Sequence, residues 1–141
     1  MATIKSFTDL EQSKKLAEFL PLESADMYYE EVCNLPKAIV GNYILHNQCM
    51  EDKDYKKLSN PVLSPAWSLA ALFNILPKNL NICRPSLDSN YKGYYWIQYY
   101  DEFMKPINYK TECYDNPVDA CVNMIIKLKE LNLLLLCTKK N

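Results

Sequence analysis

The chain has 141 residues, of which 49% are hydrophobic and 23% charged, with a formal net charge of -1 at pH 7. This length can bury a core without metals or disulfides, and the composition excludes an intrinsically disordered protein. A charge so near zero disfavours nucleic acid as the main partner, because no global field attracts phosphate. We expect one domain over residues 1–141.

Cysteine usage and the lack of long apolar runs favour a cytoplasmic protein without a membrane segment. The six cysteines are dispersed and form no C-x-x-C pair, and residues 1–9 show no signal-peptide pattern. Thiols of a chain made in the cytosol stay reduced, so most of these cysteines are expected to pack in the core. The longest apolar runs, among them Leu133–Cys137, are far shorter than a bilayer span.

The first predicted element is a helix over 9–19. Thr8 and Glu11 have the spacing of a capping box, and Pro21 is expected to stop the helix. The stretch 22–61 predicts an irregular region with one element inside it, a strand or a short helix within 37–49. The charged run 51–57 is typical of a solvated loop.

The clearest helix is predicted over 66–76. Ser64 suits the N-cap position and Pro65 the first helical position, while Pro77 ends the helix. This helix would be apolar nearly all round and would include Trp67, which is typical of a buried helix. We therefore expect it to be the central element of the fold.

The second half of the chain predicts an antiparallel meander followed by a helix. The stretch 94–100 is dense in aromatic residues that favour strands, and the segments 86–92 and 101–107 are expected to be hairpin loops. Asn116 and Pro117 mark the start of the last helix. Residues 133–136 could form a closing strand or a packed tail. The predicted fold is a small α+β domain, with strands 80–84, 94–100 and 108–114 covered on one face by helices 9–19, 66–76 and 117–131.

Two motifs carry a resemblance. The stretch Ser64–Pro77, SPAWSLAALFNILP, and the stretch beginning at Asp115, DNPVDACVNMIIKLKELNLL, together with Glu23–Met27, resemble segments of small proteins in gut Bacteroides genomes and their phages. That group has no known activity, so the resemblance implies no catalytic residues. It implies a phage or mobile-element origin and agrees with the predicted helices.

The aromatic strand is the candidate binding site. Strand alternation places Tyr94, Trp96, Gln98 and Tyr100 on one face, and Tyr95, Ile97, Tyr99 and Asp101 on the other. The rings could serve cross-strand packing, or they could form a recognition surface for another protein. The same rings could stack single-stranded nucleic acid, although only Lys92, Lys105 and Lys110 are nearby. The candidate binding residues are Tyr94, Trp96, Tyr100 and Tyr99, and the predicted function is that of a small accessory protein that binds another protein.

Catalytic chemistry has weak candidates only. His46, the single histidine, and Cys49 would share a face of a helix and could form half of a metal site or an activated thiolate. Asp26 and Glu30, with Glu31 beside them, would meet on a helix as a carboxylate pair within the acidic stretch 23–31. Two isolated glycines, Gly41 and Gly93, cannot build a phosphate-binding loop. We expect no cofactor and no metal, and we regard an enzyme as the weakest alternative.

Overall fold

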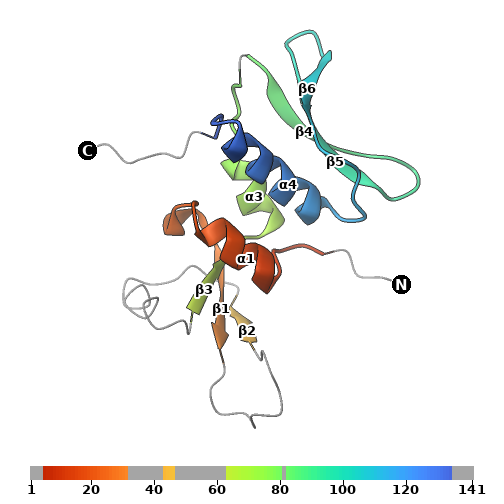
Figure 1. Cartoon of the computed structure of the whole chain (residues 1–141). Helices are drawn as coiled ribbons and strands as arrows, with labels where there is room; N and C mark the ends of the chain where they lie inside the picture. Colours follow the sequence, from red (N-terminus) through yellow and green to blue (C-terminus); the bar gives the residue numbers. More distant parts are fainter. Residues whose placement is uncertain (1–4, 32–42, 47–62, 81, 135–141) are drawn as a thin grey trace. The chain divides into compact units, whose positions relative to one another are not determined.

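The computed structural model describes residues 5–31, 43–46, 63–80 and 82–134, and these residues form an α+β fold, which confirms the predicted class (Figure 1). They fall into two compact units. One unit holds residues Phe7–Ala71, and the other holds residues from Leu72 onward together with those up to Ser6. A single domain over residues 1–141 stays a prediction.

Each unit contains one antiparallel sheet of three strands within the described residues. The first sheet has the order β2-β1-β3, and the second has the order β4-β5-β6. The elements of the first unit are helix α1 (Leu10–Ala17), the short 3-10 helix η1 (Leu22–Ser24), β1 (Met27–Glu31), β2 (Tyr43–His46) and β3 (Leu63–Ala66). Helix α3 (Leu69–Ile75) spans the boundary, and the second unit continues with β4 (Arg84–Ser89), β5 (Tyr95–Tyr100), β6 (Pro106–Lys110) and α4 (Pro117–Glu130).

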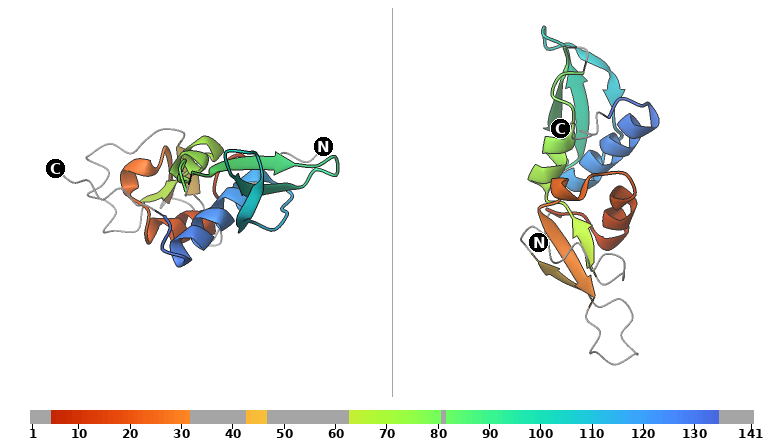
Figure 2. Two further views of the ribbon diagram at one scale, coloured as in Figure 1. Left: turned by 90° about the horizontal axis from the view of Figure 1, so that it is seen from above. Right: turned by 90° about the vertical axis from the view of Figure 1, so that its left-hand side faces the viewer.

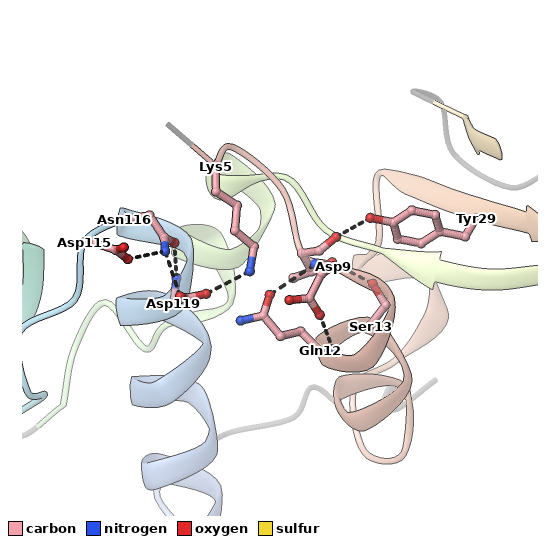
Figure 3. Close-up of polar contacts among 9 residues, drawn as sticks. Lys5, Asp9, Gln12, Ser13, Tyr29, Asp115, Asn116 and Asp119 are labelled. Atoms are coloured by element: carbon pink, nitrogen blue, oxygen red, sulfur yellow. Dashed lines mark hydrogen bonds and ion pairs between the residues drawn. The ribbon is translucent and has the colours of Figure 1, made fainter. Parts of the chain in front are cut away.

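The N-cap of helix α1 is Asp9, one residue later than the predicted cap. The Asp9 carboxylate accepts from the Gln12 amide N–H at 2.8 Å, and the Asp9 N–H donates to the Gln12 side chain at 3.1 Å (Figure 3). The predicted pair Thr8 and Glu11 was therefore wrong by one position. Thr8 is buried instead, where its hydroxyl contacts the Ser13 hydroxyl at 2.8 Å and accepts from the Trp67 N–H at 3.1 Å.

The helix predicted over 66–76 begins at Leu69, and the residues before it form strand β3. Ser68 caps this helix: its hydroxyl accepts from the Ala71 N–H at 3.2 Å, and its own N–H donates to Asp26 at 2.8 Å. Pro65, predicted at the first helical position, lies instead on β3, which is an edge strand of the described sheet. It pairs there with Tyr28 of β1. An edge strand tolerates proline because one side of it needs no ladder hydrogen bond.

The region 22–61 is more regular than predicted in its described parts. Strand β1 pairs with both β2 and β3, so two strands and a 3-10 helix lie where one element was expected. The adjacent Met27 and Tyr28 are both buried, so β1 lacks the alternation of apolar and polar residues that would have identified a strand. Residues 47–61 lie outside the described residues.

Strand β4 lies after the stretch predicted for it. Leu80 and Cys83 exchange backbone hydrogen bonds of 3.0 and 2.9 Å, which closes a tight turn where a strand over 80–84 was expected. Arg84–Ser89, mostly predicted as a loop, pairs with the aromatic strand β5. The third strand is confirmed in part: β6 spans Pro106–Lys110, and hydrogen bonds from Thr111 and Tyr114 continue its pairing with β5.

Helix α4 forms as predicted. Asn116 accepts from the Asp119 N–H at 2.8 Å and donates to the Asp119 carboxylate at 2.7 Å, and Pro117 occupies the first turn (Figure 3). The Lys5 ammonium lies 2.9 Å from Asp119. The helix lies along one face of the β4-β5-β6 sheet and packs on β5 (Figure 2). Its buried residues are Pro117, Val118, Ala120, Cys121, Val122, Met124, Ile125 and Leu128.

The loops of the two hairpins of this sheet have the same conformation. Asn90 and Asp101 each accept two backbone N–H groups with the side-chain oxygen, from the residues two and four positions later. The residue three positions later is left-handed in both loops, Gly93 with φ +83° and Met104 with φ +62°. Glycine adopts this conformation without steric cost, whereas methionine does not.

We expect opposite effects from exchanges at these two positions. Met104→Gly should raise the free energy of unfolding by about 0.5–1 kcal/mol, because the relief of strain exceeds the added freedom of the unfolded chain. Gly93→Ala should lower it by about 1 kcal/mol, although the added Cβ would meet no atom within 4 Å. Urea denaturation of both variants measures this, and a shift of the same sign in both would contradict it.

Candidate functional site

Strand β5 turns its side chains alternately toward and away from α4. Ile97 and Tyr99 are fully buried, as helix α4 packs on this strand. Trp96 and Tyr100 are half-buried on the opposite face, and Tyr94, just before the strand, is 45% exposed. The structure therefore brings Trp96 and Tyr100 together on one face of the sheet, with Tyr94 at its margin. We call this surface the open face.

Tyr99 does not belong to the open face. Its hydroxyl donates to the Pro77 carbonyl at 2.9 Å, and its ring meets that of Tyr109 edge-on at 6.3 Å between centroids. Burial raises the pKa of the Tyr99 phenol well above its usual value. The prediction of Tyr99 as a binding residue was wrong, because strand alternation places it in the core.

Tyr100 is held in place by a carboxylate on the neighbouring strand. Its hydroxyl donates to Asp88 Oδ2 at 2.6 Å, and the Ser86 hydroxyl donates to Asp88 Oδ1 at 2.7 Å. The hydrogen bond to Asp88 is the largest cause of a raised pKa for Tyr100. A ring fixed in this way loses little side-chain freedom when a ligand binds to it.

Trp96 lies between charged groups of the two neighbouring strands. It is directly opposite Asp88 on β4, and the Lys110 ammonium lies 5.5 Å from the centroid of its ring. An exposed cation–π contact of this kind contributes about 0.5–1 kcal/mol. The open face thus presents an indole whose one neighbour is cationic and whose other neighbour is anionic.

Gln98 also lies on β5, but its side chain stabilises the strand pairing. Gln98 pairs with Lys110 and Tyr100 pairs with Pro106, so β6 holds two more residues than β5 over this span. The Gln98 amide fills this bulge and donates to the carbonyls of Tyr99, Ile107 and Tyr109 at 3.0, 2.6 and 3.3 Å. Gln98 is consequently buried and is not presented to a ligand.

Two residues of the open face, Ser86 and Asp88, were missed by sequence reasoning, whereas Arg84 ended the predicted strand 80–84. Arg84, Ser86 and Asp88 lie opposite Tyr100, Gln98 and Trp96 on β4, in the segment expected to be largely a loop. The sequence did contain a signal for a strand here, because the apolar Leu87 alternates with the polar Ser86 and Asp88. Alternation over so short a polar segment is weak evidence for a strand, and the segment forms β4 because it pairs with the aromatic strand β5.

Two open surface pockets adjoin one end of this sheet. One has a volume of about 320 Å³ and is lined by Arg84, Pro85, Ser86, Tyr100, Asp101 and Met104. The other has a volume of about 290 Å³ and is lined by Lys78, Asn79, Ile82, Arg84 and Glu102. Arg84, the single arginine of the chain, lines both.

The residues considered for acid–base chemistry are not brought together. His46 lies on strand β2, where its ring stacks on Tyr28 at 4.5 Å and its Nε2 lies 3.1 Å from Glu30. Asp26 accepts from Ser68, and Glu30 lies on strand β1, so the helix on which Asp26 and Glu30 could have met as a carboxylate pair does not form. Cys49 lies outside the described residues, and in the described part of the chain no three His, Cys, Asp or Glu residues cluster to hold a metal.

The described cysteines, Cys83, Cys113 and Cys121, lie in two environments. Cys121 is fully buried on α4, and burial raises its pKa to about 12, so essentially no thiolate forms near neutral pH. Cys83 is also buried, whereas Cys113 is exposed. Cys121 is therefore a core residue, as predicted for most cysteines.

The open face and its pockets belong to an antiparallel sheet backed by a helix, a fold class that hosts many functions. In comparisons with family models, curated proteins and solved structures, nothing matches this chain. No helix within the described ranges is long and apolar enough to cross a bilayer.

Brief alkylation with iodoacetamide at neutral pH should separate the two kinds of cysteine. We expect Cys113 to be labelled in the native protein, and Cys121 only after unfolding in urea, because the reagent needs an accessible thiolate. Mass spectrometry of tryptic peptides reads out each site, and Cys113→Ser is the control. Labelling of Cys121 in the native protein at the rate of Cys113 would contradict the expectation.

Proposed function

We propose that this chain is a small accessory protein that binds another protein through the open face. The observation that carries the proposal is the half-exposure of Trp96 and Tyr100 on the face of β5 opposite α4. Tyrosine and tryptophan provide large contact areas with few rotatable bonds, and protein interfaces are enriched in them. The bond from Tyr100 to Asp88 supports this proposal because it orients the ring before a partner arrives.

The proposed setting follows from the sequence. The resemblance to proteins of Bacteroides and their phages supports a phage or mobile-element origin. Free thiols at Cys113 and Cys121 agree with a cytoplasmic location. An enzyme built on His46, Cys49 or the acidic stretch 23–31 has less support, because Asp26 and Glu30 have different hydrogen-bond partners.

Single-stranded nucleic acid is the second candidate ligand of the open face. Lys110 over the Trp96 ring and Arg84 opposite Tyr100 favour it, since bases stack on aromatic rings beside cations that contact phosphate. Asp88 is opposite Trp96 and accepts from the Tyr100 hydroxyl, however, and a carboxylate there repels phosphate. We therefore place protein binding first.

Truncation of the two rings tests the proposal. We expect Trp96→Ala and Tyr100→Ala each to weaken a captured protein partner by about tenfold to thirtyfold, as for an aromatic residue in an interface centre. The measurement is quantitative pull-down from cells that carry the gene, with thermal unfolding to verify each fold. Leu131→Ala, which truncates an exposed residue at the end of α4, is the matched control. Unchanged recovery with both ring variants would exclude this face.

An oligothymidylate titration decides between the two ligands. If nucleic acid binds, its affinity should fall by roughly an order of magnitude or more between about 50 mM and about 200 mM salt. Binding of this kind, lost in Trp96→Ala, would replace protein binding as the proposal. We expect no binding at the lower salt concentration.

A further inference from the structure

The outer edge of β4 has backbone groups that nothing in the described residues pairs with. Tyr95 exchanges hydrogen bonds of 2.7 and 2.8 Å with Tyr114, and Ile97 bonds to Thr111, so both use the β6 side of β5. In an antiparallel pair, the residues opposite such positions turn their own N–H and C=O groups outward. These residues are Ser89, Leu87 and Pro85.

Proline occupies the outward position nearest the pockets. Pro85 has no N–H, so the edge offers the N–H groups of Leu87 and Ser89 and the carbonyls of all three residues. A free edge of this kind can accept an added strand from another chain. The missing donor at Pro85 removes one of the groups through which identical edges would pair.

Arg84, next to this edge, has the chemistry to bind a carboxylate. It is exposed, and no carboxylate of the described residues lies within ion-pair distance of its guanidinium. Asp101, which shares a pocket with it, accepts instead from the N–H groups of Phe103 and Lys105 at 2.9 Å each. A guanidinium presents a planar fork of donors that matches a carboxylate.

An exposed apolar side chain accompanies Arg84 in each pocket. Met104 is 73% exposed in one, and Ile82 is 68% exposed in the other. Both residues are left-handed, with φ of +62° and +67°, which is uncommon for methionine and an outlier for a β-branched residue. Local bonds hold them there, from Met104 N–H to the Asp101 carbonyl and from Ile82 N–H to the Asn79 side chain.

The charges around these pockets favour a peptide over a nucleic acid. Lys78 and Arg84 are balanced by Asp101 and Glu102 among the lining residues, so a chain of phosphates would meet as many anions as cations. A single carboxylate between apolar groups needs only one cation, and Arg84 lines both pockets. Arginine, methionine and tyrosine are also residue types that protein interfaces favour.

We propose that an extended peptide segment of a partner protein pairs with the outer edge of β4 and places an acidic side chain on Arg84, with apolar side chains against Ile82 and Met104. The proposal rests on the proposed protein-binding function and names its ligand. Main-chain hydrogen bonds along β4 would give affinity, and Arg84 with its two pockets would give specificity.

Selection from a display library of random linear peptides tests the proposal with the full chain as bait. We expect enriched peptides to share an acidic residue flanked by apolar residues. Fluorescence anisotropy of a synthetic enriched peptide should show at least about tenfold weaker binding to Arg84→Glu, and replacement of the acidic residue by lysine should restore it. Arg84→Gln should have an intermediate effect.

A second pair of variants tests strand pairing. Ser89→Pro removes an outward N–H at an exposed position, whereas Ser89→Ala keeps it. We expect the proline variant alone to weaken peptide binding, by about fivefold or more. Amide exchange at Leu87 and Ser89 should slow when the peptide is bound.

Three outcomes would overturn the proposal: no enriched peptide, enriched peptides without an acidic residue, or binding unaffected by Arg84→Glu. Peptides that depend on Trp96 but not on Arg84 would leave the open face as the binding surface and refute the edge site. Peptides that depend on Arg84 and Ser89 but not on Trp96 or Tyr100 would refute binding through the two rings of the open face and support the edge site.

Discussion

The packing of β5 against α4 determines what the second unit can present to a ligand. Once Ile97 and Tyr99 are buried under the helix, the alternation of a strand leaves Trp96 and Tyr100 no place except the opposite face. Burying side chains of this size contributes roughly 1.5–3 kcal/mol each, far more than an exposed contact. The core side of β5 is therefore fixed energetically, and the open face is its geometric consequence.

A bulge in β6 opposite Gln98 shifts the register between β5 and β6. An amide side chain on the open side of β5 would ordinarily be solvated, yet Gln98 turns to the carbonyls that the register shift leaves unpaired. Gln98 lies between Trp96 and Tyr100 along β5, and because it is buried no ligand reaches it. The Tyr100 ring is instead tied to β4 through Asp88, so the orientation of the open face depends on the pairing of β4 with β5.

Local chemistry explains which elements could be predicted from the sequence. Helix α4 and the aromatic strand followed from signals inside their own segments: Asn116 with Pro117, and the density of aromatic residues. Trp67 and β4 could not be placed in this way. Ser64 and Pro65 mimic a helix start, and only the distant Asp26 makes Ser68 the actual cap. Trp96 and Tyr100 were predictable by alternation, whereas Arg84 and Asp88 depend on a polar segment being recruited as a strand by its partner.

Two residues of the second unit have a backbone conformation that does not suit their side chains, and both line pockets with Arg84. Glycine and asparagine suit left-handed positions, but Ile82 and Met104 adopt left-handed backbone conformations and expose apolar side chains in the two pockets that share Arg84. Such conflicts between a residue and its conformation each cost about 1–3 kcal/mol and tend to occur at functional sites. The equivalent hairpin position at the other end of the sheet carries Gly93, which has no such conflict. The same loop is thus built without strain at one end of β5, and with strain at the end where the free edge of β4 meets Arg84.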